Sequence, residues 1–239
     1  MTRLSIAFLA TALVALGTTA QATDWVAGKQ YSILPQAQRT NVAPGKVEVM
    51  EVFSYGCPHC DQFRPVMKRL KAALPANAQL VYLPAGWSEA ENWPLMQRAY
   101  LTAQSLGVAD KAHDAMFDAV WSTGELAVLD GNNRLKPKAA LPNIDAMARF
   151  YQRVTGVKAA DFVAASKSFG VDLKIRQADS QIKAMQVTGT PTLVVAGKYR
   201  VNNENLTSND DMIELVKYLV AKETPAPKPA AATAPTKKP

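Results

Sequence analysis

The chain has very little cysteine and histidine, with two residues of each among 239. A structural zinc site needs four ligands, and these residues lack the spacing of a zinc finger. Both cysteines lie within one stretch, Cys57-Pro58-His59-Cys60, where a disulfide closes too short a loop to restrain the unfolded chain much. The cysteine content therefore disfavours a metal-binding module and an inert structural crosslink.

Long apolar runs are absent after the N-terminal region. There, Arg3 gives a short positive segment, an apolar stretch covers 4–17, and Ala20-Gln21-Ala22 matches a small-x-small cleavage site. The stretch is shorter than the ~20 residues of a membrane span, which disfavours the alternative of a membrane anchor. We therefore expect 1–22 to be a cleaved signal peptide and the mature protein to be exported to a compartment where disulfides persist.

The chain also lacks a basic patch. Its formal net charge is +7, but Arg3 falls in the expected signal peptide, and four lysines against one glutamate lie in 221–239. The remaining body has a small positive excess with charges of both signs mixed along it. Because nucleic-acid binding leaves a clustered basic footprint, we expect no nucleic-acid partner.

The C-terminal segment 223–239 has no aromatic or branched aliphatic residue and consists mainly of Pro, Ala, Thr and Lys. A segment of this composition cannot bury a core, so we expect a disordered tail. Attachment to the cell wall or to a partner is one role for such a tail, and a solvated segment with no specific role is the alternative.

The cysteine pair lies between a predicted strand and a predicted helix. The segment 47–53 is rich in β-branched and apolar residues, which is typical of a strand. After the pair, apolar residues recur at helical spacing, and Pro75 stops the expected helix near Ala73. A pair of cysteines in this context is a far more specific signal than two cysteines alone.

This position favours ionisation of Cys57. The first backbone N–H groups of a helix have no partner within it, so they and the helix dipole stabilise a thiolate at its start. Pro58 suits the first turn, because its fixed φ is helical and its missing N–H would be unpaired. His59 adds a donor beside the same sulfur. Cys60 lies one turn into the helix, and we expect it to be the buried, resolving thiol.

A stabilised thiolate makes the disulfide a stronger oxidant. If the pKa of Cys57 lies about three units below ambient pH, the reduced form gains roughly 4 kcal/mol, or on the order of 90 mV. A low-pKa thiolate is also a good leaving group, so its disulfide passes quickly to a substrate. The motif therefore indicates the active site of an oxidant.

Strand-bearing parts flank a helical middle, which predicts an α/β fold. Further strands are expected at 29–34, 79–83, 192–196 and 199–201, the last two joined by a turn at Gly197-Lys198. Helices are expected at 94–106, 110–120, 144–154, 162–169, 171–186 and, capped by Ser208 or Asn209, up to Leu219. Three tryptophans, Trp87, Trp93 and Trp121, are expected in the core, and His113 is expected at the surface or in packing.

Together with Gly189-Thr190-Pro191 before the last hairpin, these features resemble the DsbA family of periplasmic thiol:disulfide interchange proteins over 25–222. The resemblance implies a thioredoxin fold with an inserted all-helical domain. Its parts are a thioredoxin-like domain at 23–86 and 187–222, and a helical insertion at 87–186 that ends in the helix returning to the core. DsbA proteins are an established case of a low-pKa cysteine and an oxidising disulfide, so the estimate above agrees with the family rather than adding to it.

The resemblance also assigns roles to residues outside the cysteine motif. Pro191 is expected to be a cis-proline that faces the cysteines, although the sequence alone is also compatible with a trans turn proline. Thr190 before it is expected to present its backbone to an extended substrate peptide. Glu51 matches the buried acid of the family, and we expect it to exchange a proton with Cys60. The alternative is a carboxylate that reaches solvent.

Two positions depart from the well-known members of the DsbA family. Gly56 stands where a bulky aromatic precedes the first cysteine, and Thr190 stands where valine often precedes the proline. The family's lysine near the buried acid is also absent, since Val81 and its neighbours have no charge. Redox potential and peptide preference therefore cannot be transferred from those members.

The expected function is donation of the Cys57–Cys60 disulfide to newly exported proteins by thiol-disulfide exchange. No cofactor is expected, and the partners implied are exported proteins with free cysteines and a DsbB-like membrane reoxidase, with the protein itself a monomer. A disulfide isomerase or reductase of the same fold is the first alternative. The segment before the first strand is too short for the dimerisation domain of such isomerases. A non-enzymatic thiol or metal-binding module is the second alternative.

Overall fold

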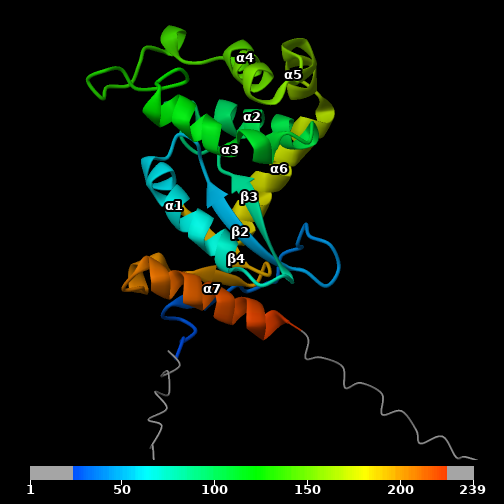
Figure 1. Cartoon of the computed structure of the whole chain (residues 1–239), viewed down its shortest axis with the longest axis vertical. Helices are drawn as coiled ribbons and strands as arrows, with labels where there is room; N and C mark the ends of the chain where they lie inside the picture. The colour runs from blue at the N-terminus through cyan, green and yellow to red at the C-terminus, as the bar shows by residue number, and fades with distance from the viewer. Residues whose placement is uncertain (1–23, 225–239) are drawn as a thin grey trace, which may run out of the picture.

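A computed structural model describes residues 24–224 and shows one five-stranded mixed sheet with helices on both faces (Figure 1). The strands are β1 Tyr31–Ile33, β2 Val47–Phe53, β3 Ala78–Pro84, β4 Thr192–Val195 and β5 Tyr199–Val201. Their order is β1-β5-β4-β2-β3, with β2 and β3 parallel and the other neighbours antiparallel. The predicted thioredoxin fold with a helical insertion is confirmed.

Three helices cover the sheet, and four more form a layer at the end where β2 and β3 finish. In Figure 1, α1 and α7 lie on one face of the sheet and α6 lies on the other. The covering helices are α1 Pro58–Ala73, α6 Phe169–Ala184 and α7 Asn209–Glu223. The helical layer contains α2 Trp93–Ser105, α3 Ala109–Phe117 with a π-helical turn at Asp118–Ser122, α4 Ile144–Thr155 and α5 Ala159–Ser166.

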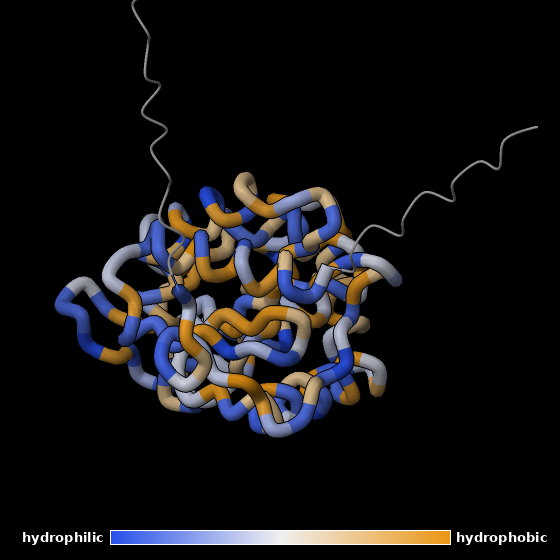
Figure 2. Tube along the Cα trace, turned by 90° about the horizontal axis from the view of Figure 1, so that it is seen from below, coloured by the Kyte–Doolittle hydropathy of each residue, from blue (hydrophilic) through white to orange (hydrophobic). Residues whose placement is uncertain are grey.

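The central strand β2 is buried along its whole length, as expected for a strand covered on both faces. The loop after β2 leads to Cys57 at the start of α1, so a fully buried strand fixes where the site begins. Hydrophobic segments run through the interior, and hydrophilic stretches occupy the peripheral loops (Figure 2).

None of the helices within residues 24–224 has the length and apolar character that a membrane span requires. The expected signal peptide and residues 225–239 of the tail lie outside the described residues.

Three of the described helices, α4, α6 and α7, begin at a capping side chain. The Asn143 side chain accepts a bond from the backbone N–H of Ala146, and Gly156 ends α4 in the left-handed region at φ 87°. Ser208 caps α7 by accepting from the N–H of Asp211. The predicted ends of α4 and the predicted start of α7 are confirmed, whereas α7 continues past its predicted end at Leu219 to Glu223.

Several predicted boundaries are wrong by a few residues. Val108, not Asp110, caps α3, and the predicted helix 162–169 is α5 at 159–166. Phe169 instead begins α6, because Ser168 caps that helix. The helix α7 includes Glu223, whose carboxylate accepts a 2.7 Å bond from the Tyr199 hydroxyl, so the predicted tail began one residue early.

The β4–β5 turn is also shifted by one residue from its predicted place. Its positive-φ residues are Ala196 at 54° and Gly197 at 61°. A Cβ on Gly197 would lie 2.3 Å from the backbone oxygen of Gln38, so only glycine fits there.

Candidate active site

The cysteine pair lies at the N-terminus of α1, directly after β2. Cys57 is the N-cap residue with φ −89° and ψ 116°, and Pro58 follows in the first helical turn. The backbone oxygen of Cys57 accepts bonds from the N–H groups of Cys60 at 3.1 Å and Asp61 at 3.2 Å. The predicted placement of the pair at a helix start is confirmed, and both residues are thiols in this structure.

The surroundings of Cys57 favour its thiolate. A hydrogen bond from the Cys60 thiol makes the largest contribution in lowering the pKa of Cys57, to about 6. A hydrogen bond from the Thr190 side chain and the backbone N–H groups of Cys60 and His59 lower it further, while burial opposes them. Cys57 is only 4% exposed, so an attacking thiol can reach it only through a small opening.

Cys60 behaves in the opposite way. Its side chain is buried, and this burial raises the pKa of the Cys60 thiol well above its usual value. The neighbouring Cys57 and Glu51 raise it further. The two sulfurs therefore differ sharply in acidity, with the outer one ready to ionise and the inner one holding its proton.

Glu51 lies on β2 beside this inner sulfur and is 3% exposed. Burial raises the pKa of Glu51 to about 8, and the charge of Cys57 adds to the shift. The predicted burial is confirmed, and the alternative of a solvent-reaching carboxylate is wrong. No hydrogen bond to the carboxyl group is found in the described part of the chain, where Glu51 and Cys60 line one cavity.

The segment before β4 faces the cysteines from across the site. The Cys57 thiol donates to the backbone oxygen of Thr190 at 3.4 Å, and the Thr190–Pro191 peptide bond is cis, as the resemblance implies. The fold thus brings Cys57, Cys60, Glu51, Thr190 and Pro191 together.

His59 lies in the motif but contributes differently from expectation. Both Pro58 and His59 are exposed at the surface, next to buried Cys57. His59 lowers the pKa of Cys57 through its backbone N–H, and in the described structure no hydrogen bond joins its imidazole to the sulfur.

Sequence reasoning missed the environment of Gly56. A Cβ on Gly56 would lie 2.4 Å from Nε1 and 2.6 Å from Cδ1 of Trp93, so the indole occupies the space beside this residue. The Trp93 ring stacks on Trp87 with centroids 6.4 Å apart, and Trp87 is 43% exposed rather than in the core as predicted. Trp121 donates from Nε1 to the backbone oxygen of Tyr55 at 2.8 Å and so supports the same loop.

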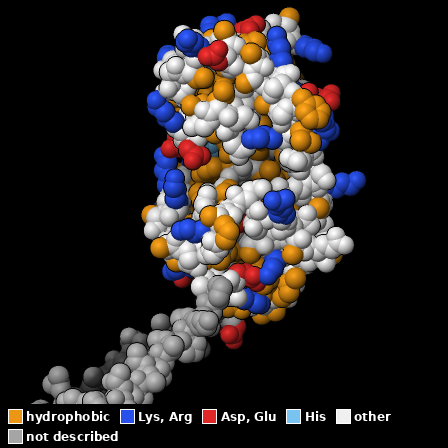
Figure 3. Space-filling model, turned by 90° about the vertical axis from the view of Figure 1, so that its right-hand side faces the viewer, with side chains coloured by type: hydrophobic (Ala, Val, Ile, Leu, Met, Phe, Trp, Pro, Cys, Tyr) orange, Lys and Arg blue, Asp and Glu red, His pale blue; other side chains and the backbone are white. Residues whose placement is uncertain are grey.

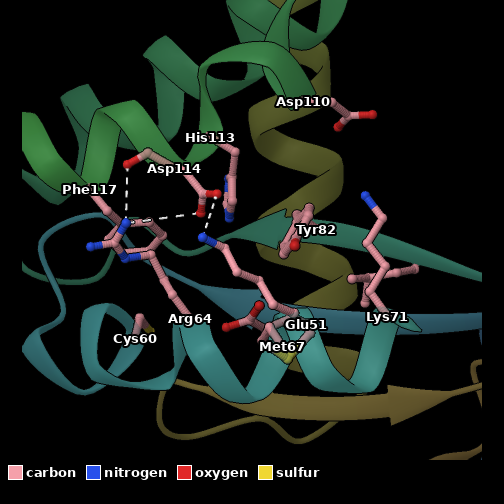
Figure 4. Close-up of a pocket in the computed structure, with 12 residues that line it drawn as sticks. Glu51, Cys60, Arg64, Met67, Lys71, Tyr82, Asp110, His113, Asp114 and Phe117 are labelled. Carbon is pink, nitrogen blue, oxygen red and sulfur yellow. Dashed lines mark hydrogen bonds and ion pairs between the residues drawn. The ribbon is translucent and has the colours of Figure 1, made fainter. Parts of the chain in front are cut away.

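A cavity of about 130 Å³ lies between α1 and the helical layer and reaches the inner side of the cysteine pair (Figure 4). It is lined by Glu51, Cys60, Arg64, Met67, Lys68, Lys71, Leu80, Tyr82, Asp110, His113, Asp114 and Phe117. Figure 3 shows one face of the molecule hollowed at mid-height, with apolar atoms in the hollow and charged side chains around it. His113 is buried here, so the packing interpretation of this residue is confirmed and the surface one is wrong.

A sulfur that ionises readily beside a second, buried sulfur passes a disulfide to another thiol or takes one from it, which is the chemistry of thiol-disulfide oxidoreductases. Among residues 24–224, no three His, Cys, Asp or Glu side chains are grouped to hold a metal ion.

Comparisons with known proteins agree with this class. The protein-family model for the DSBA-like thioredoxin domain matches residues 48–220 of this chain. The thiol:disulfide interchange protein DsbA of Pseudomonas aeruginosa is 35% identical over 216 residues, covering 89% of this chain and 92% of the relative. The DsbA of Pseudomonas syringae pv. tomato is 34% identical over 228 residues, covering 95% and 97%. The crystal structure of the oxidoreductase DsbA from Xylella fastidiosa gives a TM-score of 0.71 at 30% identity, covering 83% of this chain and 97% of that one.

The chain therefore belongs to the DsbA family of thioredoxin-fold proteins. It is a thiol-disulfide oxidoreductase.

Proposed function

We propose that the protein is an oxidase that donates the Cys57–Cys60 disulfide to exported proteins with free cysteines. The observation that supports this direction is the low pKa of Cys57, about 6, beside a partner thiol whose pKa is raised. A stabilised thiolate stabilises the reduced pair, so the oxidised pair readily gives up its disulfide.

In the proposed reaction, a substrate thiolate attacks Cys57, and Cys60 leaves with the electron pair of the broken S–S bond. Glu51 gives its proton to the Cys60 sulfur. A second substrate thiol then attacks the mixed disulfide and releases Cys57 as a thiolate. His59 and Pro58 hold the start of the helix, and Thr190 with Pro191 forms the surface against which an extended substrate segment lies. The electron pair passes between sulfurs, so no cofactor is required.

Three further parts of the proposal concern the cell. Residues 1–22 direct export to the periplasm and are removed, a DsbB-like membrane protein reoxidises the pair, and the protein acts as a monomer. N-terminal sequencing of the exported protein should give Thr23, and sedimentation should give the mass of one chain. An uncleaved chain retained in membranes would contradict the export proposal.

The oxidase direction is tested by equilibrating the protein in graded glutathione buffers and counting free thiols by alkylation. An oxidising midpoint is expected, at which a little reduced glutathione in the presence of excess oxidised glutathione already reduces half of the protein. A midpoint as reducing as that of thioredoxin would contradict the proposal and favour a reductase. In cells, Cys60→Ser should accumulate mixed disulfides with exported proteins through Cys57, and Cys57→Ser should accumulate none.

A further inference from the structure

A buried histidine without a role in the reaction above faces the same cavity as Cys60 and Glu51. His113 on α3 is 8% exposed. Its Nδ1 lies 3.1 Å from the Tyr55 hydroxyl, which occupies that nitrogen. Whichever of the two groups donates, Nε2 is left for another partner, and residues 24–224 provide no hydrogen bond to it. The imidazole is therefore held through Nδ1, and Nε2 is available to a water.

The imidazole also packs against the strand beside the one that holds the buried acid. Parallel pairing of β2 with β3 places Tyr82 beside Glu51, and the His113 ring stacks on Tyr82 with centroids 4.0 Å apart and an interplanar angle of 29°. Figure 4 shows His113, Tyr82 and Glu51 around the one cavity, with Cys60 at its side. Glu51 and His113 are therefore both neighbours of Tyr82, and both line one cavity.

This cavity suits water. Its volume is about 130 Å³, whereas one water takes about 30 Å³ of liquid volume. Glu51 and His113 provide polar groups in its lining, and a buried water needs two to four such partners. The cavity can therefore hold a short water chain that begins at Glu51.

Charged groups and tyrosine hydroxyls face His113 from several elements. They are Arg64, Lys68 and Lys71 from α1, Asp110 and Asp114 from α3 itself, Glu51 from β2, and the hydroxyls of Tyr55 from the loop after β2, Tyr82 from β3 and Tyr100 from α2. Burial lowers the pKa of His113 to about 4, with Asp114 opposing the shift and Arg64 and Lys71 adding to it. A neutral imidazole both donates and accepts, which is what a water-holding group needs.

The reaction requires a proton path at this place. When Cys60 leaves the disulfide, its sulfur takes a proton from Glu51, and the carboxylate must regain one from solvent. In the reverse step, Cys60 gives its proton to the carboxylate as its sulfur attacks Cys57. Because Glu51 is almost fully buried, either proton has to cross the cavity.

We propose that His113 is a positioning residue for proton transfer at Cys60, with its Nε2 holding a water in the cavity that links the Glu51 carboxyl group to solvent. The inference rests on the exchange chemistry proposed above and extends it to the proton's route. The ion pair between Lys68 and Asp114, 3.0 Å long, lies among the residues that line the same cavity.

The kinetic test follows one intramolecular step against pH. The reduced protein is mixed with oxidised glutathione, and the rate at which Cys60 displaces glutathione from Cys57 is measured. In this step the Cys57–glutathione S–S bond breaks, the Cys57–Cys60 bond forms, and the Cys60 proton goes to Glu51. With His113→Phe we expect this rate to fall about tenfold at pH 7 and its pH midpoint to rise by about one unit. His113→Gln, which retains a polar group in the cavity, should restore most of the rate.

The matched control is Phe117→Leu. Phe117 lines the same cavity and packs edge-on against His113, with centroids 5.4 Å apart, but has no polar atom. This variant should lose stability and keep the rate within about twofold and the midpoint unchanged. A wild-type pH profile in His113→Phe, or an equal change in His113→Phe and Phe117→Leu, would overturn the proposal.

A second measurement uses chains whose folding is not in question. The protein has only two histidines, so their ring nitrogens are readily assigned by NMR. The nitrogen shifts of His113 should show a step where Glu51 ionises, and the step should vanish in Glu51→Gln. Absence of the step in the wild type would overturn the proposal. Failure of the oxidase direction would appear separately, as a reducing midpoint in glutathione, because the proton must cross the cavity in either direction of exchange.

Discussion

The Cys57 sulfur lies 3.4 Å from the backbone oxygen of Thr190, a residue 133 positions later in the chain. The contact joins the start of α1 to the segment before β4, and it exists because β2 and β4 are neighbours in the sheet. The same residue lowers the pKa of Cys57 through its side chain. The acidity of the active-site sulfur is therefore set by both halves of the interrupted thioredoxin domain.

Replacing Thr190 with valine tests this relationship. Thr190→Val removes the hydroxyl while keeping the branched shape, so the pKa of Cys57 should rise by about half a unit to one unit. The measurement is the pH dependence of alkylation of the reduced protein. The control is Thr192→Val, the same change two residues away, where the hydroxyl bonds to the backbone oxygen of Gly189 at 2.8 Å. Equal midpoints in both variants would show that the Thr190 hydroxyl has no part in the acidity.

Gly56 is expected to tolerate no side chain while Trp93 is in place. Because an added Cβ would meet the indole at 2.4 Å, Gly56→Ala should lower the free energy of unfolding by about 1–3 kcal/mol. Urea unfolding followed by tryptophan fluorescence measures the loss.

A double-mutant cycle identifies the cause of that loss. In a Trp93→Leu background the indole is gone, so Gly56→Ala should cost at least about 1 kcal/mol less than in the wild type. An additive cycle would mean that the alanine is destabilising for some other reason.

Glu51 should make stability depend on pH. Its pKa is raised from 4.5 to about 8, so the folded protein keeps a proton that the unfolded chain releases. Stability should therefore fall as pH rises from about 4.5 to 8 and stay lowered above that range. Glu51→Gln removes this decline, so the variant should be more stable than the wild type by about 3 kcal/mol at pH 7 and similar at pH 4.

The comparison is best made on the oxidised protein, where Cys57 cannot ionise. Urea unfolding across the pH range measures the difference, and Glu214→Gln, at an exposed site, serves as the control. A wild-type pH profile in Glu51→Gln would place the pKa of Glu51 near its ordinary value.

Arg64 joins α1 to the helical layer. Its guanidinium lies 2.8 Å from Asp61 and 2.9 Å from Asp118, and it stacks over the Phe117 ring at 5.4 Å. Its side chain is 19% exposed, whereas that of Lys68 in the pair with Asp114 is 65% exposed. Arg64→Met should lower the free energy of unfolding by about 1 kcal/mol or more, and Lys68→Met should change it by less than about 0.5 kcal/mol. Equal losses in urea unfolding would contradict this ranking.

The sequence alone predicted the parts of the fold that rest on local patterns. The strand 47–53 and the helix after Cys57 have the predicted boundaries, because β-branched and apolar residues dominate the strand and a proline lies near each end of the helix. Errors occurred where two signals competed. Asp110 looks like a cap but lies in the first turn of α3, and Phe169 looks like the end of one helix but begins the next.

The site was predictable only in part, since several contacts come from residues far apart in sequence. Burial of Glu51 followed from strand alternation within one segment. The contact of Trp93 with Gly56 depends on how the helical insertion packs against the loop after β2, and no local pattern encodes it. The same holds for His113. It lies on α3 among alanines, far from the cysteines in sequence, and only the folded chain brings it to the cavity that Glu51 also lines. A second signal, such as its isolation as one of two histidines, was too weak to single it out.

The pH titration of the Cys57 thiolate in the reduced protein tests the account most directly. Alkylation rates are measured from low to high pH, and mass spectrometry assigns the modified residue. The account predicts a midpoint near 6 on Cys57, with Cys60 unmodified across the same range. A midpoint near that of ordinary cysteine, about 8.5, would contradict it, because the disulfide would then lack the stabilised product that makes it an oxidant.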